Sequence, residues 1–376
     1  MIMRPRVLLL IPHFGGGGAE AVFALLARGL SREKYEIHIG LVTQANIPAE
    51  CALEGVPTHA LGARRIRRAA LRLAALVRRL RPQLILSGMF HLNFLVLLLR
   101  PFFPRPVRII VRQNGTISSA IKFGNQPAYT RLLYRALYRR ADKIICQSTA
   151  MASDLARELG VEESRLAVLP NPVDVLAIRI AAEQSTNSWS GCGPHLVAVG
   201  RLAKEKGFDL LLESLASVRK FFPDADLVIA GSGSEKAALK ARCSELGLDA
   251  AVRFAGNLDQ PAVLFQGASA FVLSSRHEGM PNALLEAAAA GLPIVATAAS
   301  GGIVDLLRNR PGAWLATEIT SAALADSIRL ALEGLHPQER FTHEFIEPFR
   351  LESAIRGYEE LIDALLDEEE MRQAAR

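Results

Sequence analysis

Cysteine is scarce in this chain of 376 residues, and no cluster of metal ligands accompanies it. The four cysteines are scattered, with no Cys-x-x-Cys pair and no group of histidines nearby; they are Cys51, Cys146, Cys192 and Cys243. This pattern excludes a zinc ribbon and a disulfide framework, and it is typical of proteins in a reducing cytosol.

Long hydrophobic runs are also absent. The apolar start Val7–Ile11 is too short for a secretory signal, and it leads directly into Gly15–Gly18. The most hydrophobic stretch, Leu84–Leu99, contains polar residues and ends at an Arg-Pro pair. Because a membrane-spanning helix needs about 20 apolar residues, we expect a soluble, cytoplasmic protein.

Acidic residues are nearly missing from Gly55 to Ser153, which holds 18 basic residues and one acid, Asp142. Residues 1–170 carry 25 basic and 10 acidic residues, whereas residues 171–376 carry 19 and 28. The net charge of +6 therefore conceals a strongly basic first half and an acidic second half. Such asymmetry indicates an anionic partner for the first half, either nucleic acid or a membrane surface.

Short apolar runs alternate with helical patterns along the whole chain. In the first half the expected strands are Arg6–Ile11, Tyr35–Val42, Gln83–Ser87, Val107–Arg112 and Lys143–Gln147, and the expected helices are Ala19–Leu30, Arg64–Arg81 and Tyr129–Arg140. In the second half the expected strands are His195–Val199, Leu227–Ala230, Val252–Ala255, Ala270–Leu273 and Pro293–Ala296, with helices beginning at Gly207 and Asn282. Uninterrupted apolar strands joined by helices predict parallel sheets covered on both faces. We therefore expect two Rossmann-like α/β domains that face each other across a cleft, with a boundary near Pro170–Pro194.

The first candidate binding loop is Gly15–Glu20, which directly follows an expected strand. Successive glycines let backbone N–H groups approach a phosphate, and the following helix start adds partial positive charge. A dinucleotide fingerprint is the other functional interpretation, but it requires an acid after the next strand. That strand ends Leu41–Gln44 without one, which disfavours a dehydrogenase.

Two more loops follow strands of the second half. Gly200–Gly207 places Arg201 and Lys206 just after a buried strand, and these cations suit a diphosphate. Lys204 is expected to be a solvated charge. Gly231-Ser232-Gly233 provides small residues against which a nucleotide can lie.

The strongest signal is the pair Glu278 and Glu286, which have seven residues between them. Glu278 falls in a loop after a strand, and Glu286 falls inside the following helix within a run of alanine and leucine. The intervening Gly279–Asn282 can present backbone amides at the helix start. A carboxylate on a largely buried helix usually has a hydrogen-bonding role, because burying one without a partner costs several kcal/mol.

Together these loops resemble glycosyltransferase family 4, the retaining nucleotide-sugar transferases of GT-B fold, over nearly the whole chain. Asn171–Asp174 and Ser300–Gly302 add to the resemblance, and Glu278–Asn282 looks like bacterial members that build polysaccharides, such as lipopolysaccharide or capsule, or lipid-linked oligosaccharides. The resemblance implies that residues 1–170 bind the acceptor, that residues 171–350 bind the nucleotide-sugar donor, and that a C-terminal helix at 351–376 packs back on the first domain.

Site roles follow from the same resemblance. Arg201 and Lys206 are expected to neutralise the donor diphosphate, Glu286 to hold the ribose hydroxyls and Glu278 to contact the donor sugar. Other residues expected at the donor are Gly17, Gly18, Gly231, Gly233, Gly279, Met280, Pro281 and Asn282. The transferred sugar is expected to be a hexose or N-acetylhexosamine, and UDP is the expected nucleotide.

The implied mechanism is front-face attack with retention, in which the leaving phosphate helps to deprotonate the acceptor. The enzyme then supplies positioning and charge stabilisation, so we expect no metal and no cofactor. Asp224-Ala225-Asp226 looks like a metal motif, but it precedes a strand and so lies at the wrong end of the sheet.

Candidate acceptor-side residues lie in the first half. His91 follows the expected strand Gln83–Ser87 and is a candidate for contact with the acceptor or sugar, although a histidine in such a segment is more often simply packed. Arg112 and Asn114, at the end of another strand, are candidates for binding the acceptor.

The basic segment Arg64–Arg81 has apolar residues spaced as on one helical face, with arginines largely off that face. This composition is typical of helices at anionic lipid surfaces, although an ordinary helix packed on its own sheet explains the apolar face equally well. Nucleic acid is disfavoured because no recognition module or interleaved aromatic residues are present. We expect peripheral contact with the inner face of the cell membrane.

Two alternative functions remain open. A nucleotide-sugar epimerase of the same fold would need further acid–base groups and would form no new glycosidic bond. A non-catalytic nucleotide-sugar-binding protein at the membrane is disfavoured because Glu278, Arg201, Lys206 and Glu286 are all present.

Overall fold

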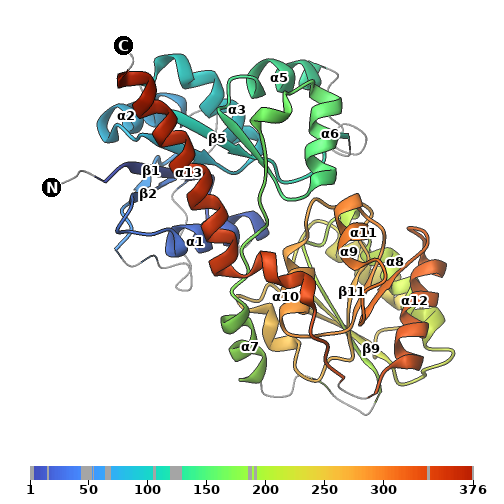
Figure 1. Cartoon of the computed structure of the whole chain (residues 1–376). Helices are drawn as coiled ribbons and strands as arrows, with labels where there is room; N and C mark the ends of the chain where they lie inside the picture. Colours follow the sequence, from blue (N-terminus) through green and yellow to red (C-terminus); the bar gives the residue numbers. More distant parts are fainter. Residues whose placement is uncertain are drawn as a thin grey trace. The chain divides into compact units, whose positions relative to one another are not determined.

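The computed structural model describes residues 4–14, 17–43, 53, 55–63, 69–104, 107–118, 129–184, 189, 193–336 and 339–374. The chain forms two compact units (Figure 1). Unit 1 combines Met1–Pro172 with Pro348–Arg376, and unit 2 is Val173–Glu347.

Unit 1 contains a seven-stranded parallel sheet in the order β3-β2-β1-β4-β5-β6-β7. Its strands are β1 (Arg6–Ile11), β2 (Glu36–Leu41), β3 (Thr58–Ala60), β4 (Leu84–Ser87), β5 (Arg108–Arg112), β6 (Lys143–Cys146) and β7 (Leu166–Val168). Its helices are α1 (Gly18–Gly29), α2 (Ala70–Leu80), α3 (Phe90–Leu99), α5 (Tyr129–Tyr138), α6 (Thr149–Leu159) and α13 (Leu351–Ala374), with 3-10 turns η3 (Arg100–Phe102) and η4 (Glu163–Arg165).

Helices cover both faces of this sheet. Side chains of a strand alternate between its faces, so Val7 and Leu9 pack with α1 and α13, whereas Leu8 and Leu10 pack with α2, α3, α5 and α6. Burial on both faces is the reason why the strands are uninterrupted apolar runs.

Unit 2 contains a six-stranded parallel sheet in the order β10-β9-β8-β11-β12-β13. Its strands are β8 (His195–Val199), β9 (Asp226–Ala230), β10 (Val252–Gly256), β11 (Ala270–Leu273), β12 (Ile294–Ala296) and β13 (Ala313–Leu315). Its helices are α7 (Val175–Glu183), α8 (Phe208–Val218), α9 (Lys236–Glu245), α10 (Asn282–Ala289), α11 (Gly301–Leu307) and α12 (Ser321–Gly334), with 3-10 turns η5 (Lys204–Lys206) and η6 (Pro261–Leu264). A further 3-10 segment, η7 (Glu344–Phe349), precedes α13.

The expected α/β alternation is confirmed, and the differences are local. The basic helix ends at Leu80 because Arg81 adopts a left-handed conformation with φ of 48°, and residues 64–68 lie outside the described part of the chain. The pattern missed α3 because its almost uniformly apolar sequence has no helical periodicity. No helix among the described residues is long and apolar enough to cross a bilayer.

Candidate functional site

The order of strands places the candidate site of unit 2. Strand order reverses between β8 and β11, and loops at the carboxyl ends of the two strands beside such a reversal form the usual binding crevice of an open α/β sheet. The loop after β8 carries Arg201 and Lys206, and the loop after β11 carries Glu278. Three of the predicted residues therefore meet at the carboxyl edge of one sheet.

Lys206 and Glu278 form the centre of this site. Lys206 Nζ lies 2.5 Å from Glu278 Oε1, and Ser275 Oγ donates to the same oxygen over 2.6 Å. The side chains of Lys206 and Glu278 are 22% and 11% exposed. Within the described residues, Glu278 Oε2 makes no hydrogen bond or ion pair. The carboxylate is thus held through one oxygen, and its other oxygen can accept a hydrogen bond from a hydroxyl group.

Arg201 lies at the rim of the same edge. Its side chain is 70% exposed, and its Nη2 is 2.6 Å from Glu205 Oε1. Burial opposes ionisation of Glu205, but hydrogen bonds from the backbone and from Arg201, with the charge of that arginine, outweigh it and lower the pKa of Glu205. Both cations expected to bind a diphosphate are therefore neutralised by carboxylates in the free protein.

Sequence reasoning missed the pair that holds these loops together. Arg276 binds Asp209 through two hydrogen bonds of 2.7 and 2.5 Å, and its backbone N–H donates to Glu205 O over 2.8 Å. The Asp209 hydrogen bond raises the pKa of Arg276, and the Arg276 hydrogen bond lowers the pKa of Asp209. Like Arg201, Arg276 follows an apolar strand closely, and this position was the available signal.

Gly231 and Gly233 are required by packing. Gly231 has a φ of 140°, and a Cβ on it would lie 1.9 Å from Gly200 O. A Cβ on Gly233 would lie 2.2 Å from Leu202 O. These glycines let the loop after β9 pack directly against the loop after β8. Their contact with a donor stays a prediction.

Glu286 lies in the middle of α10, where it is half-buried. No side chain of the described residues forms a hydrogen bond or ion pair with its carboxylate, and burial raises its pKa to about 7. A half-buried carboxylate without an internal partner makes Glu286 a candidate for an external hydrogen-bond donor.

The segment between the two glutamates is anchored at its start. Glu278 N–H donates to Ala299 O over 3.3 Å, and Ser300 Oγ donates to Gly279 O over 3.2 Å. Pro281 is the N-cap of α10, and no side chain caps that helix. Met280 and Asn282 belong to the same turn. The loop after β12 thus holds the loop after β11 in place.

In unit 1, Gly17 and Gly18 lie at the start of α1. Gly17 is the N-cap, and a Cβ on it would lie 2.3 Å from Glu20 Oε2. Glu20 is buried, and His13 Nδ1 lies 3.8 Å from its carboxylate. Since a carboxylate already occupies this helix start, a second anion there is electrostatically disfavoured and a neutral sugar fits better. Gly15 and Gly16 lie outside the described residues.

Arg112 and Asn114 are in contact, but their surroundings differ. Arg112 is only 2% exposed and donates to the side-chain oxygens of Asn114 and Asn171. Asn114 is exposed, and its amide donates to Gly88 O. Arg112 therefore acts as a buried clamp, whereas Asn114 remains available to a ligand.

His91 is exposed in the first turn of α3, and its ring lies 4.6 Å from the ring of Phe90. It is therefore not packed in the core. Asn93 on the same helix is buried and donates to Arg112 O over 3.0 Å, which ties the start of α3 to the end of β5.

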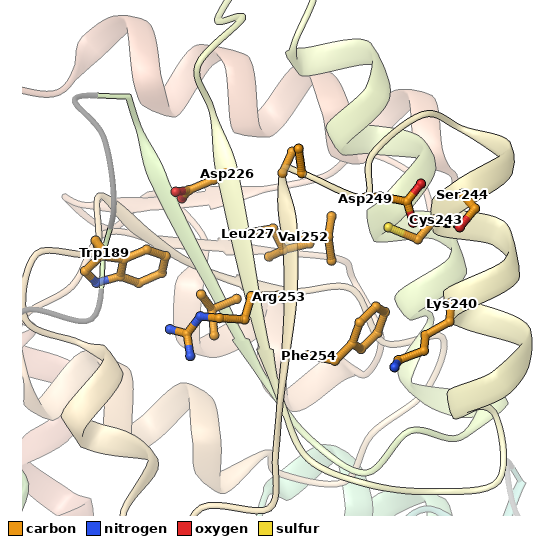
Figure 2. Close-up of a pocket in the computed structure, with 13 residues that line it drawn as sticks. Trp189, Asp226, Leu227, Lys240, Cys243, Ser244, Asp249, Val252, Arg253 and Phe254 are labelled. Atoms are coloured by element: carbon orange, nitrogen blue, oxygen red, sulfur yellow. Dashed lines mark hydrogen bonds between the residues drawn. The ribbon is translucent and has the colours of Figure 1, made fainter.

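A hollow of about 570 Å³ lies elsewhere, beside the edge strand β10 and the amino end of β9. Figure 2 shows Trp189 on one side of it and Lys240 and Cys243 of α9 on the other. His195 Nδ1 lies 2.9 Å from Asp226 Oδ1 there. Asp226 thus has an internal partner, and in the described ranges no group of three His, Cys, Asp or Glu side chains is arranged to hold a metal. The candidate site is therefore the group of charged side chains in the loops after β8 and β11, and not this hollow.

Two family models match the chain. Residues 16–175 match Glycosyltransferase Family 4, and residues 185–345 match Glycosyl transferases group 1. The lipopolysaccharide core biosynthesis glycosyltransferase LpsE of Rhizobium meliloti is 26% identical over 77% of this chain and 78% of its own length.

A Campylobacter jejuni relative is 27% identical over 79% of this chain and 82% of its own length. It is named N-acetylgalactosamine-N,N'-diacetylbacillosaminyl-diphospho-undecaprenol 4-alpha-N-acetylgalactosaminyltransferase. The solved structure of Anabaena HepE with UDP and glucose has a TM-score of 0.79 at 17% identity. The match covers 96% of this chain and 100% of the HepE chain.

Proposed function

Because the chain belongs to the glycosyltransferases that these two models describe and has the GT-B fold, we propose that it is a retaining enzyme of polysaccharide biosynthesis. It transfers a hexose or N-acetylhexosamine from a UDP-sugar to a glycan or lipid-linked saccharide. The observation that carries this proposal is the Lys206–Glu278–Ser275 cluster at the carboxyl edge of unit 2. The UDP of the HepE complex and the lipid-linked acceptor in the name of the Campylobacter relative support donor and acceptor.

The two cations of the site neutralise the donor diphosphate. Arg201 is exposed and bound only to Glu205 among the described residues, so a diphosphate can replace that carboxylate. Lys206 stays near Glu278 and carries the second positive charge. These two charges stabilise the leaving diphosphate as the glycosidic bond breaks, without a metal or cofactor.

Glu278 orients the donor sugar. Its Oε1 is fixed by Lys206 and Ser275, so its Oε2 accepts a hydrogen bond from a sugar hydroxyl. With the sugar held on one face, the acceptor hydroxyl attacks from the side of the leaving phosphate, and that phosphate takes the proton. Positioning of this kind supplies much of the rate enhancement available to an enzyme.

Glu286 accepts hydrogen bonds from the ribose hydroxyls. Its carboxylate is half-buried and has no partner within the described part of the chain, and two adjacent hydroxyls can satisfy its oxygens. Ligand binding then favours the ionised form, which the buried environment of the free protein disfavours.

Unit 1 receives the acceptor. Among its exposed polar groups at the carboxyl edge are His91 and Asn114, and Arg112 holds Asn114 in place by a hydrogen bond. A lipid-linked acceptor, such as the one in the name of the Campylobacter relative, lies at the membrane, so the proposed enzyme works in the cytoplasm at the inner face of the cell membrane. No nucleic acid takes part.

Thermal unfolding in EDTA with UDP-, GDP- and ADP-sugars and with NAD tests the donor site. A ligand at 100 times its Kd stabilises the protein by about 2.7 kcal/mol, which shifts the midpoint visibly. We expect a shift with UDP-sugars that Arg201→Ala abolishes and that Arg308→Ala, an exposed arginine of the same unit, retains. A shift with NAD alone contradicts the proposal, as does a UDP-sugar shift that requires a metal. The anomeric configuration of the product then tests retention.

A further inference from the structure

The two faces of unit 1 carry opposite charge. The elements α2, α3, η3 and α5, with Arg81, Arg139 and Arg140 at their ends, contain nine arginines and no acidic residue. We call these elements the docking layer. On the other face, α13 contains eight acidic and two basic residues. The sheet thus separates a cationic side from an anionic side.

The docking layer also exposes large apolar side chains. The exposed fractions are 85% for Leu71, 56% for Leu98, 62% for Phe102, 68% for Leu132 and 42% for Leu133. Single exposed hydrophobic residues are ordinary, but these five belong to one layer of helices. α3 contacts both α2 and α5, so the three helices lie side by side (Figure 1).

The side chains of several arginines in this layer are not bound to other groups in the described part of the chain. Among the described residues, the guanidinium groups of Arg78, Arg79, Arg139 and Arg140 form no hydrogen bond or ion pair. Arg78 and Arg79 lie in the last turn of α2, and the other two follow α5. Arg100 of η3 donates to Arg140 O, which brings the end of α3 beside the end of α5. Free cations therefore flank the exposed Leu98 and Phe102.

We propose that the docking layer lies flat on an anionic bilayer, with Leu71, Leu98, Phe102 and Leu132 in the acyl boundary and the free arginines among the headgroups. This inference rests on the membrane association proposed above and assigns its surface. Exposed leucines between unpaired arginines match an interfacial protein surface. A second copy of the chain is disfavoured because nine like charges would face nine others, and nucleic acid gains nothing from exposed leucines.

This orientation also positions the acceptor side of unit 1. His91 lies in the first turn of α3, itself part of the docking layer, and Asn114 follows β5, so both lie at the carboxyl edge of the sheet. Leu71 and Leu132 lie near the starts of α2 and α5 at this edge, and the free arginines lie at the other ends of these two helices. A lipid-linked acceptor that diffuses in the bilayer can reach this edge without leaving the membrane, while the acidic α13 covers the opposite face of the sheet.

Vesicle co-sedimentation of the full chain tests the surface. The wild-type protein is expected to bind vesicles of phosphatidylglycerol and phosphatidylcholine in equal parts and to bind pure phosphatidylcholine far less. Its binding to the anionic vesicles is expected to weaken as the salt concentration rises. Each free arginine contributes about fivefold, so the double variant Arg139→Gln/Arg140→Gln is expected to bind roughly 25-fold more weakly. Leu98→Ser/Phe102→Ser is expected to lose at least about tenfold.

Matched controls lie in unit 2. Phe221 is 65% exposed and Arg308 and Arg310 are exposed, so Phe221→Ser and Arg308→Gln/Arg310→Gln are expected to bind like wild type. Equal losses in these controls would overturn the assigned surface, as would full binding by the docking-layer variants or no binding by wild type. Concentration-dependent dimers that Leu98→Ser/Phe102→Ser abolishes would also overturn it in favour of a second copy. The UDP-sugar thermal shift, measured on each variant, separates these failures from failure of the donor site.

Discussion

Both units place an arginine at or just after the carboxyl end of a parallel strand, but the two arginines have opposite surroundings. Arg112 of unit 1 is 2% exposed and fixed by asparagine side chains, whereas Arg201 of unit 2 is 70% exposed and paired with one carboxylate. The first is committed to its own chain, and the second can exchange its partner for a ligand. Burial, and not residue type or position after a strand, decides which of the two cations is open to the ligand proposed above.

The largest expected effect is on the chemistry of unit 2. Glu278→Ala removes the partner of Lys206 and the oxygen proposed to orient the sugar, so kcat is expected to fall by about 10²–10³-fold while donor Kd changes far less. Glu245→Ala, an exposed carboxylate on α9, is the control. Steady-state kinetics and calorimetric binding of UDP check both, and an unchanged kcat in Glu278→Ala would remove Glu278 from the site.

Replacing each of the two arginines by alanine tests the comparison directly. Arg112→Ala removes a buried guanidinium that donates to the side-chain oxygens of Asn114 and Asn171, and it is expected to lower the free energy of unfolding by about 2–4 kcal/mol. Arg201→Ala is expected to change it by less than about 0.5 kcal/mol, because its pair is exposed. Denaturant unfolding distinguishes them, and similar losses in both variants would contradict the argument from burial.

Backbone packing gives the next test. Gly231→Ala forces a methyl group against Gly200 O at a φ of 140°, so we expect a loss of about 1–3 kcal/mol in stability. In unit 1, a Cβ on Gly115 would meet no atom of the described residues within 4 Å, and Gly115→Ala is expected to be nearly neutral. Thermal midpoints of the two variants would be equal if loop packing at unit 2 were loose.

The last test concerns pH and has an expected size similar to that of the glycine substitution. Because burial raises the pKa of Glu286 from its ordinary 4.5 to about 7, the folded state retains a proton that the unfolded state releases. Stability is therefore expected to fall as pH rises from about 5 to 7, by about 1–3 kcal/mol, and then to level off. Glu286→Gln should remove this slope, as followed by denaturant unfolding across that range, and should also weaken UDP binding. An identical slope in wild type and variant would assign it to other groups.

Much of the fold was predictable because it depends on short-range patterns. Arg6–Ile11, His195–Val199 and Ala270–Leu273 were expected as strands and are strands with those bounds, since each is a buried apolar run with polar or glycine-rich flanks. β3 and β13 escaped prediction because their side chains are exposed or half-buried and form no apolar run, whereas the equally short β12 is fully buried. The apolar α3 escaped because its nearly uniform sequence leaves no polar stripe, although His91 and Leu98 are exposed.

The candidate site was likewise predictable in part. Glu278, Lys206 and Arg201 were identifiable because each follows a strand whose carboxyl end is expected at the binding edge. The Arg276–Asp209 pair was not, because its partners are 67 residues apart and meet only when β8 and β11 become neighbours.

By itself, the sequence determined the α/β alternation, the parallel sheets, the resemblance to glycosyltransferases and the arginine-rich composition of the first half, because these depend on local pattern and composition. Tertiary structure alone decided that Arg112 is buried, that Lys206 meets Glu278, that Glu286 has no partner in the described chain and that exposed leucines share one layer with free arginines. The physical reason is that burial and pairing depend on strand order and helix contacts, which bring together residues that no local pattern connects.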